Sequence, residues 1–163
     1  METKRTKRIL SGLCLLAMTA FVSTGCGGKD DDPAPGTKKM NMKVTISVVG
    51  LEASDNVYFQ IGAANHDASQ YGAPVWKMNG TTQGNTHMIE LKEQQFLGST
   101  KTYVLETVKA FDFGSLNFDY SNQGAPLTVS YKVEIDGKVK TNVQNKVVPA
   151  GGSDDQNLTY KPE

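Results

Sequence analysis

From residue 40 to the C-terminus, apolar and polar side chains alternate along much of the chain. Successive side chains of a β-strand point to opposite faces, so an alternation with a period of two predicts strands with one buried and one solvated face. Short apolar segments at 75–78 and 158–160 predict two further strands. The alternating segments are 42–48, 57–61, 87–91, 116–120, 127–135 and 139–147.

The clearest signal is the pair of segments 127–135 and 139–147, which flank Asp136-Gly137. An Asp-Gly pair between alternating segments favours a two-residue turn with positive φ at both positions, which matches the twist of the flanking strands. The sequence therefore predicts a β-hairpin here, with Val139, Thr141, Val143 and Val147 on one face of its second strand.

Two segments give mixed signals. Residues 101–113 carry Val104, Val108 and Phe111 at a helical spacing, but their β-branched and aromatic content favours a buried strand. Residues 91–97 are compatible with one helical turn.

Eight or nine short strands separated by Gly-, Asn- and Ser-containing turns predict an all-β domain over residues 40–163. We expect a single antiparallel β-sandwich, immunoglobulin-like or transthyretin-like. A closed lipocalin-like barrel is the alternative. Neither architecture has a sequence fingerprint here, because the Cys–Trp–Cys spacing of true immunoglobulin domains is absent.

The N-terminus has a basic segment at 4–8, an apolar stretch at 9–22 and three small residues, Ser23-Thr24-Gly25, before Cys26. The apolar stretch is shorter than the roughly 20 residues that cross a bilayer, and the layout is typical of a cleaved export signal. It resembles bacterial lipoprotein signals, whose lipobox ends in two small residues and a cysteine, although Ser23 stands where leucine is usual. The resemblance implies a signal peptide at 1–25 and acylation of Cys26, for example by palmitate. The alternative is an ordinary secretory signal with an incidental cysteine.

Residues 26–39 form a glycine-, proline- and acid-rich segment with too few apolar side chains for a core, which predicts a flexible tether. Within it, Lys29, Asp30, Asp31 and Asp32 resemble the surface-export signal of Bacteroidota lipoproteins. Together with Gly27, this resemblance implies an outer-membrane lipoprotein that faces the cell exterior.

Charge and cysteine content exclude several function classes. Removal of residues 1–25 takes four basic residues and one acidic residue from totals of 17 and 17, which leaves a net charge of about −3. We therefore expect no nucleic-acid partner, because nucleic-acid binding uses a basic face. Cys14 leaves with the signal and Cys26 would carry lipid, so no thiolate remains for a disulfide, a metal or a nucleophile.

Motifs for catalysis or cofactor binding are missing from the sequence. His66 and His87 lack the spacing of a metal site, and neither Asp30–Asp32 nor Asp154-Asp155 fits a calcium loop. We read Asp154-Asp155 as a solvated loop. There is no Gly-x-Ser-x-Gly elbow and no phosphate-binding loop. We expect a protein that is not an enzyme, with no metal and no cofactor.

One binding hypothesis comes from the segment 65–85, which is rich in Gly, Asn, Thr and Gln and contains Tyr71, Trp76 and Asn79. An exposed aromatic ring beside amide groups suits sugar recognition, and also protein partners. In the alternative interpretation, Trp76 packs in the core. We interpret the aromatic residues at 111, 113, 118 and 120 as core.

These observations predict a non-catalytic, lipid-anchored module of the outer membrane that binds a glycan or a protein. A fimbrial or adhesin-type subunit is the first alternative, and an enzyme or an inhibitor is the second. A binder predicts exposed Tyr71 and Trp76, and a fimbrial subunit predicts an open sheet edge with a removable last strand.

Overall fold

The structure is a computed structural model that describes residues 38–163. The predicted signal peptide, Cys26 and the Lys29–Asp32 export signal lie outside these residues. The described residues form ten strands and one short helix. The elements are β1 (Met42–Val49), β2 (Asn56–Ala64), β3 (Trp76–Met78), β4 (Thr81–Thr82), β5 (Met88–Lys92), α1 (Glu93–Leu97), β6 (Thr102–Thr107), β7 (Phe113–Ser121), β8 (Leu127–Ile135), β9 (Lys138–Val148) and β10 (Ser153–Tyr160).

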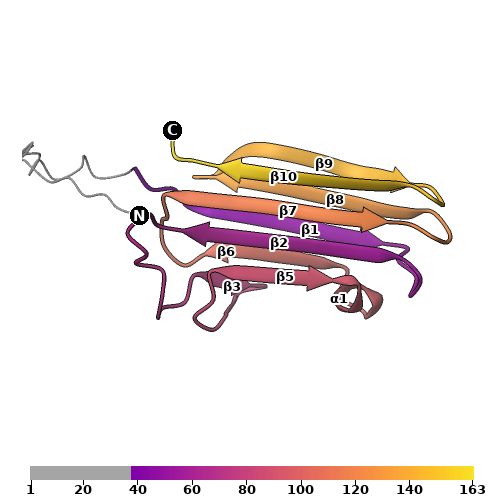
Figure 1. Cartoon of the computed structure of the whole chain (residues 1–163), viewed down its shortest axis with the longest axis horizontal. Coiled ribbons are helices and arrows are strands. Elements are labelled where there is room, and N and C mark those ends of the chain that lie inside the picture. Colours follow the sequence, from indigo (N-terminus) through magenta and orange to yellow (C-terminus); the bar gives the residue numbers. More distant parts are fainter. Residues whose placement is uncertain (1–37) are drawn as a thin grey trace, which may run out of the picture. The chain divides into compact units, whose positions relative to one another are not determined.

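The strands form two antiparallel sheets packed face to face. The six-stranded sheet has the order β4-β3-β6-β1-β8-β9, and the four-stranded sheet has the order β10-β7-β2-β5. Figure 1 shows the four-stranded sheet in front of the six-stranded one. The predicted all-β sandwich is confirmed. The alternative of a closed barrel is wrong, because each sheet of the described domain ends in an edge strand.

Alternation places the core between the two sheets. In β1 every second side chain, from Met42 to Val48, is buried, and β8 follows the same pattern from Leu127 to Ile135. Aromatic rings join the layers: the Phe118 ring lies 5.6 Å from Phe59 within the four-stranded sheet and 4.7 Å from Tyr131 of the other sheet. The apolar faces of both sheets are thereby removed from water, which is the main stabilising contribution to such a sandwich.

The predicted hairpin between β8 and β9 is confirmed. Asp136 and Gly137 have φ values of 49° and 76°, as a two-residue turn of this type requires. However, Val139 and Val147 are exposed, although the sequence placed them on one face with Thr141 and Val143. Two irregularities in the β8–β9 register interrupt the alternation of β9, and the strand changes which side chains it buries.

The two segments with mixed signals adopt the favoured conformations only in part: β6 ends at Thr107, and Leu105 is its only buried residue. Residues 102–107 form β6, and residues 93–97 form the single turn of α1, whose Phe96 is buried. Asp154-Asp155 is not a loop: both residues belong to β10, which pairs with β7 along its whole length. The sequence signal for this strand, from Leu158 and Tyr160, showed only its C-terminal end.

Candidate functional site

The aromatic binding site predicted in the segment 65–85 does not form around Trp76. The Trp76 side chain has 0% exposure, and its indole N–H donates a hydrogen bond to the His87 carbonyl at 3.1 Å. A buried ring cannot stack on a sugar, so the prediction that Trp76 contacts a ligand is wrong and the core interpretation is right.

Asn79 and Tyr71 are both exposed, and Asn79 has a structural role. Asn79 and Gly80 have positive φ and form the two-residue turn between β3 and β4. The Asn79 Oδ1 accepts a hydrogen bond from the Val104 N–H at 2.8 Å, and the Asn79 N–H donates to the Val104 carbonyl. Tyr71 is 64% exposed, with its ring edge-on to His87. With Trp76 buried and the Asn79 Oδ1 bonded to the backbone, the three residues do not form the aromatic-and-amide surface that the sequence predicted.

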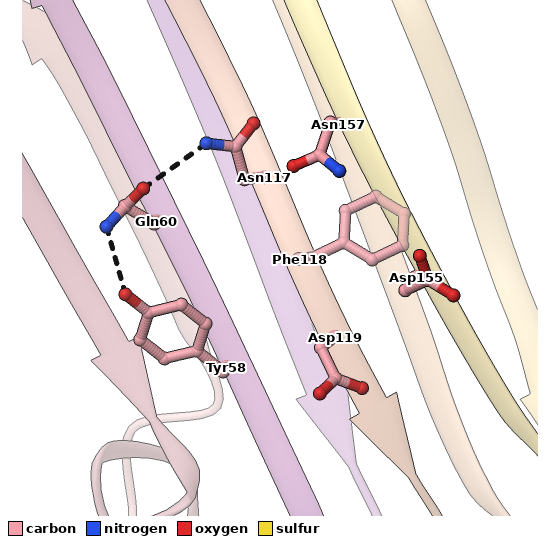
Figure 2. Close-up of a pocket in the computed structure, with 7 residues that line it drawn as sticks. All are labelled: Tyr58, Gln60, Asn117, Phe118, Asp119, Asp155 and Asn157. Carbon is pink, nitrogen blue, oxygen red and sulfur yellow. Dashed lines mark hydrogen bonds between the residues drawn. The ribbon is translucent and has the colours of Figure 1, made fainter.

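A better candidate is the outer face of the four-stranded sheet, shown in Figure 2. Residues directly opposite each other in paired strands point to the same face. Gln60 of β2 lies opposite Asn117 of β7, which lies opposite Asn157 of β10. We call these three side chains the amide row. An open hollow of about 470 Å³ lies over this part of the sheet.

A second row crosses the same strands beside the first. Tyr58 of β2 lies opposite Asp119 of β7, which lies opposite Asp155 of β10. Asp119 and Asp155 form no ion pair with any lysine or arginine of the described domain within 4.0 Å. Like charges directly opposite each other are unfavourable in a sheet, so this pair gives the face a negative potential. We call the two side chains the acidic pair.

Hydrogen bonds connect the amide row to Tyr58 and to β5 (Figure 2). Asn117 Nδ2 donates to Gln60 Oε1 at 3.2 Å, and Gln60 Nε2 donates to the Tyr58 hydroxyl at 3.0 Å. The Tyr58 hydroxyl in turn donates to Glu90 Oε1 at 2.9 Å. The network runs in one direction across three strands, so the side chains of Asn117, Gln60 and Tyr58 hold fixed orientations before any ligand arrives.

Burial, hydrogen bonds and charge set the protonation states of Tyr58 and Glu90 at the β5 end of this network. Burial, and then the hydrogen bond to Glu90, raise the pKa of Tyr58 above its usual value. The Tyr58 hydroxyl, and then Lys92, lower the pKa of Glu90. The Lys92 ammonium lies 3.3 Å from Glu90 and 5.9 Å from the centre of the Tyr58 ring. At neutral pH, Glu90 is therefore ionised and neutralised by Lys92, and Tyr58 stays protonated.

The sequence contained a signal for this face that alternation alone does not report. Asn and Asp are depleted in β-strands, yet Asn117, Asp119, Asp155 and Asn157 occupy solvent-facing positions of β7 and β10. When neighbouring strand positions carry residue types that β-strands disfavour, a functional reason for those residues is expected. Sequence reasoning missed it because the register that aligns β10 with β7 is a tertiary feature.

His66 lies beside the buried carboxylate of Asp112. His66 Nδ1 lies 3.0 Å from Asp112 Oδ1, and the His66 N–H also donates to the Asp112 carboxylate. Burial of the Asp112 carboxylate opposes its ionisation. The hydrogen bonds from His66 and the charge of His66 outweigh this effect and lower the pKa of Asp112. Within residues 38–163, no group of three or more His, Cys, Asp or Glu side chains could hold a metal ion.

Among the described residues, no helix is both long enough and apolar enough to cross a lipid bilayer.

No protein-family model matches the sequence, and no curated protein matches it either. Solved structures from Bacteroidota share the fold. A domain of unknown function, DUF4425, from Bacteroides vulgatus is 17% identical with a TM-score of 0.58, and the match covers 77% of this chain and 98% of that one. The calcium-bound form of a protein from Parabacteroides distasonis is 19% identical with a TM-score of 0.59, over 80% and 99% of the two chains.

A DUF4425 family protein from Bacteroides ovatus is also similar, with 14% identity and a TM-score of 0.52 over 76% of this chain and 95% of that one. At these identities the likeness shows a shared β-fold and no shared site. The described domain is thus an all-β sandwich of a kind found in Bacteroidota proteins.

Proposed function

We propose that this protein is a non-catalytic, lipid-anchored binding module of the outer membrane, displayed to the exterior. Its binding surface is the outer face of the β10-β7-β2-β5 sheet. One observation carries the proposal: Asn117, Gln60 and Tyr58 form an oriented hydrogen-bond network beside an open hollow. The hollow is also lined by Asn and Asp residues, which strands disfavour. Convergent polar groups over a hollow are the usual form of a ligand site.

The place of the module rests on the N-terminal sequence. Acyl chains on Cys26 would hold the chain at a membrane, and the tether at 27–39 would separate the domain from the headgroups. The acidic segment after Cys26 supports outward display. These features suit a module that captures ligands at the cell surface.

Protease treatment of intact cells tests the location. The wild-type domain should be digested without breaking the outer membrane, and Cys26→Ser should release the protein from the membrane fraction. Replacing Lys29 and Asp30–Asp32 by alanine should keep the lipid but protect the domain from protease. Digestion of the wild type only after the outer membrane is broken would refute outward display.

Ligand arrays test the binding surface. The full chain, purified in detergent, is applied to an array of polysaccharides and to an array of extracellular proteins. We expect binding to at least one array, with a loss of about tenfold in Asn117→Ala because its hydrogen bonds to the ligand disappear. The control is Asn142→Ala, which removes an exposed amide from the other sheet. Equal binding by both variants, or no binding at all, would contradict the proposed surface.

The array is run in calcium chloride and in EDTA, because the neighbour from Parabacteroides distasonis is described as calcium-bound. Binding that persists in EDTA places recognition on the side chains alone. Binding that requires calcium makes the ion part of the ligand site.

A fimbrial subunit is the second candidate, because β10 is the last strand and pairs only with β7 at the edge of its sheet. Exchange of such a strand between copies would build a polymer. A ladder of heat-sensitive oligomers on a gel, lost when residues 153–163 are deleted, would favour this candidate over the binding module.

A further inference from the structure

We infer that the ligand of this face is a glycan without acidic groups, held along the amide row across the strands. The inference rests on the proposed function and adds the class of ligand. It depends on three features of the outer face: the amide row, the Tyr58 ring and the acidic pair.

The amide row matches hydroxyl groups. Each primary amide offers two N–H donors and a carbonyl acceptor, and a sugar hydroxyl both donates and accepts. Gln60, Asn117 and Asn157 come from adjacent strands, so their amides recur at about the strand spacing of 4.8 Å. A sugar chain laid across the strands presents its hydroxyls to this row one after another.

Part of the hydrogen-bonding capacity of the row is unused. Asn117 donates through Nδ2 to Gln60, and no described residue forms a hydrogen bond with Asn117 Oδ1 or with the Asn157 side chain. In Figure 2 the Asn117 and Asn157 side chains lie side by side over β7 and β10. Gln60 sets the orientation of the Asn117 amide, and the unused groups of Asn117 and Asn157 are available to a polar ligand.

Tyr58 supplies an apolar surface at one end of the row. Its hydroxyl is fixed by Gln60 and Glu90, so the ring has lost its freedom before binding and little further entropy is lost on contact. An aromatic ring packs on the C–H face of a pyranose, and the neighbouring amides bind its hydroxyls. Figure 2 shows the ring between β2 and β5 with its hydroxyl directed to Gln60.

The acidic pair sets the charge of the ligand. Asp119 and Asp155 flank the hollow without a cation to neutralise them, whereas Glu90 is already paired with Lys92. A uronate or sulfate group in the hollow would approach both carboxylates, and like-charge contacts at a binding surface oppose association. Neutral or amino-substituted sugars meet no such repulsion. The face therefore selects against acidic glycans.

The experiment uses the full-length chain in detergent and a glycan array that holds matched neutral, amino-substituted and uronic-acid or sulfated oligosaccharides. We expect the bound glycans to be neutral or amino-substituted. Tyr58→Ala and Asn117→Ala should each weaken this binding about tenfold, while Asn142→Ala should not. Gln60→Ala provides a second amide variant if either of these fails to fold, and thermal unfolding of each variant checks the fold.

A double variant of the acidic pair tests whether the face selects against acidic glycans. Asp119→Asn combined with Asp155→Asn keeps the shape of both side chains and removes both charges. We expect it to retain the neutral glycans and to gain affinity for their acidic counterparts by about tenfold or more. Strongest binding of wild type to acidic glycans, or no gain by the double variant, would overturn the inference.

Failure of the inference can be told apart from failure of the proposed function. If the protein binds only to the protein array and Asn117→Ala loses that binding, the surface is right and the glycan is wrong. If glycans bind but Asn117→Ala, Gln60→Ala and Tyr58→Ala leave binding unchanged, the surface itself is wrong and both proposals fall.

Discussion

The indole of Trp76 is one of the largest side chains buried between the two sheets. Truncation to alanine would remove its apolar contacts, leave a cavity and take from the His87 carbonyl one of its two donors, the other being the Ala63 N–H. We therefore expect Trp76→Ala to lower the free energy of unfolding by about 4 kcal/mol, measured by denaturant titration.

The control is Tyr71→Ala in the same segment. Because Tyr71 is mostly exposed, we expect a change within about 0.5 kcal/mol. A comparable loss of stability in both variants would contradict the assignment of Trp76 to the core.

Asn122 is a buried polar residue that joins two connections between the sheets. Its Nδ2 donates to the carbonyls of Ala125 and Val148, at 2.9 and 2.7 Å, and its Oδ1 accepts from the Gly124 N–H at 2.8 Å. Its side chain has 0% exposure, so alanine would leave a cavity, remove three hydrogen bonds and take from the buried Val148 carbonyl this donor. We expect Asn122→Ala to cost about 3 kcal/mol in unfolding free energy, against no more than about 0.5 kcal/mol for the exposed Asn142→Ala.

At the scale of elements, local patterns predicted the strands well where one face is buried. The β8–β9 hairpin followed from Asp136-Gly137, because turn geometry is set by two residues. The same rule applied to Asn79-Gly80 would have predicted the β3–β4 hairpin, which the sequence analysis missed. β10 was predicted only in part, since its first residues are polar and their strand conformation comes from pairing with β7.

Gly137 gives a direct test of the hairpin turn. Its φ is 76°, and nothing lies within 4 Å of where a Cβ would stand, so an alanine there would be strained only by its backbone conformation. We expect Gly137→Ala to destabilise the domain by about 1 kcal/mol. Gly84 has the same free space without a positive φ, and Gly84→Ala should leave stability unchanged or slightly higher, as measured by thermal and urea unfolding.

For the whole molecule, the sandwich class followed from the sequence, but the binding face did not. The alternation distinguishes buried from solvated positions, and it treats all solvated positions alike. Only the register between β2, β7 and β10 shows that Gln60, Asn117 and Asn157 lie in one row. The segment with the most suggestive composition, 65–85, forms a turn and part of the core.

An ion pair connects the edge strands β9 and β10 of the two sheets, a hydrogen bond connects β10 to β7, and together they make the stability of the domain depend on pH. The buried Tyr120 hydroxyl donates to Asp154 Oδ2 at 3.0 Å, and the Lys146 ammonium lies 2.5 Å from the same oxygen. Burial, with a further contribution from Asp154, raises the pKa of Tyr120 to about 12. The hydrogen bond from Lys146 is the main cause that lowers the pKa of Asp154.

The pKa of Tyr120 is higher in the folded state than in the unfolded chain, where it is about 10. As pH rises past 10, the unfolded chain loses this proton first, so stability is complete below pH 10 and is lost between pH 10 and about 12. Two pKa units correspond to about 3 kcal/mol, and urea unfolding from pH 8 to 12 measures this loss.

Tyr120→Phe should flatten much of this decline, although Tyr131 and Tyr160, whose pKa values are also raised by burial, leave a remainder. Tyr71→Phe, at an exposed position, should keep the wild-type slope. If Tyr120→Phe kept it too, the alkaline loss of stability would have to arise elsewhere in the fold.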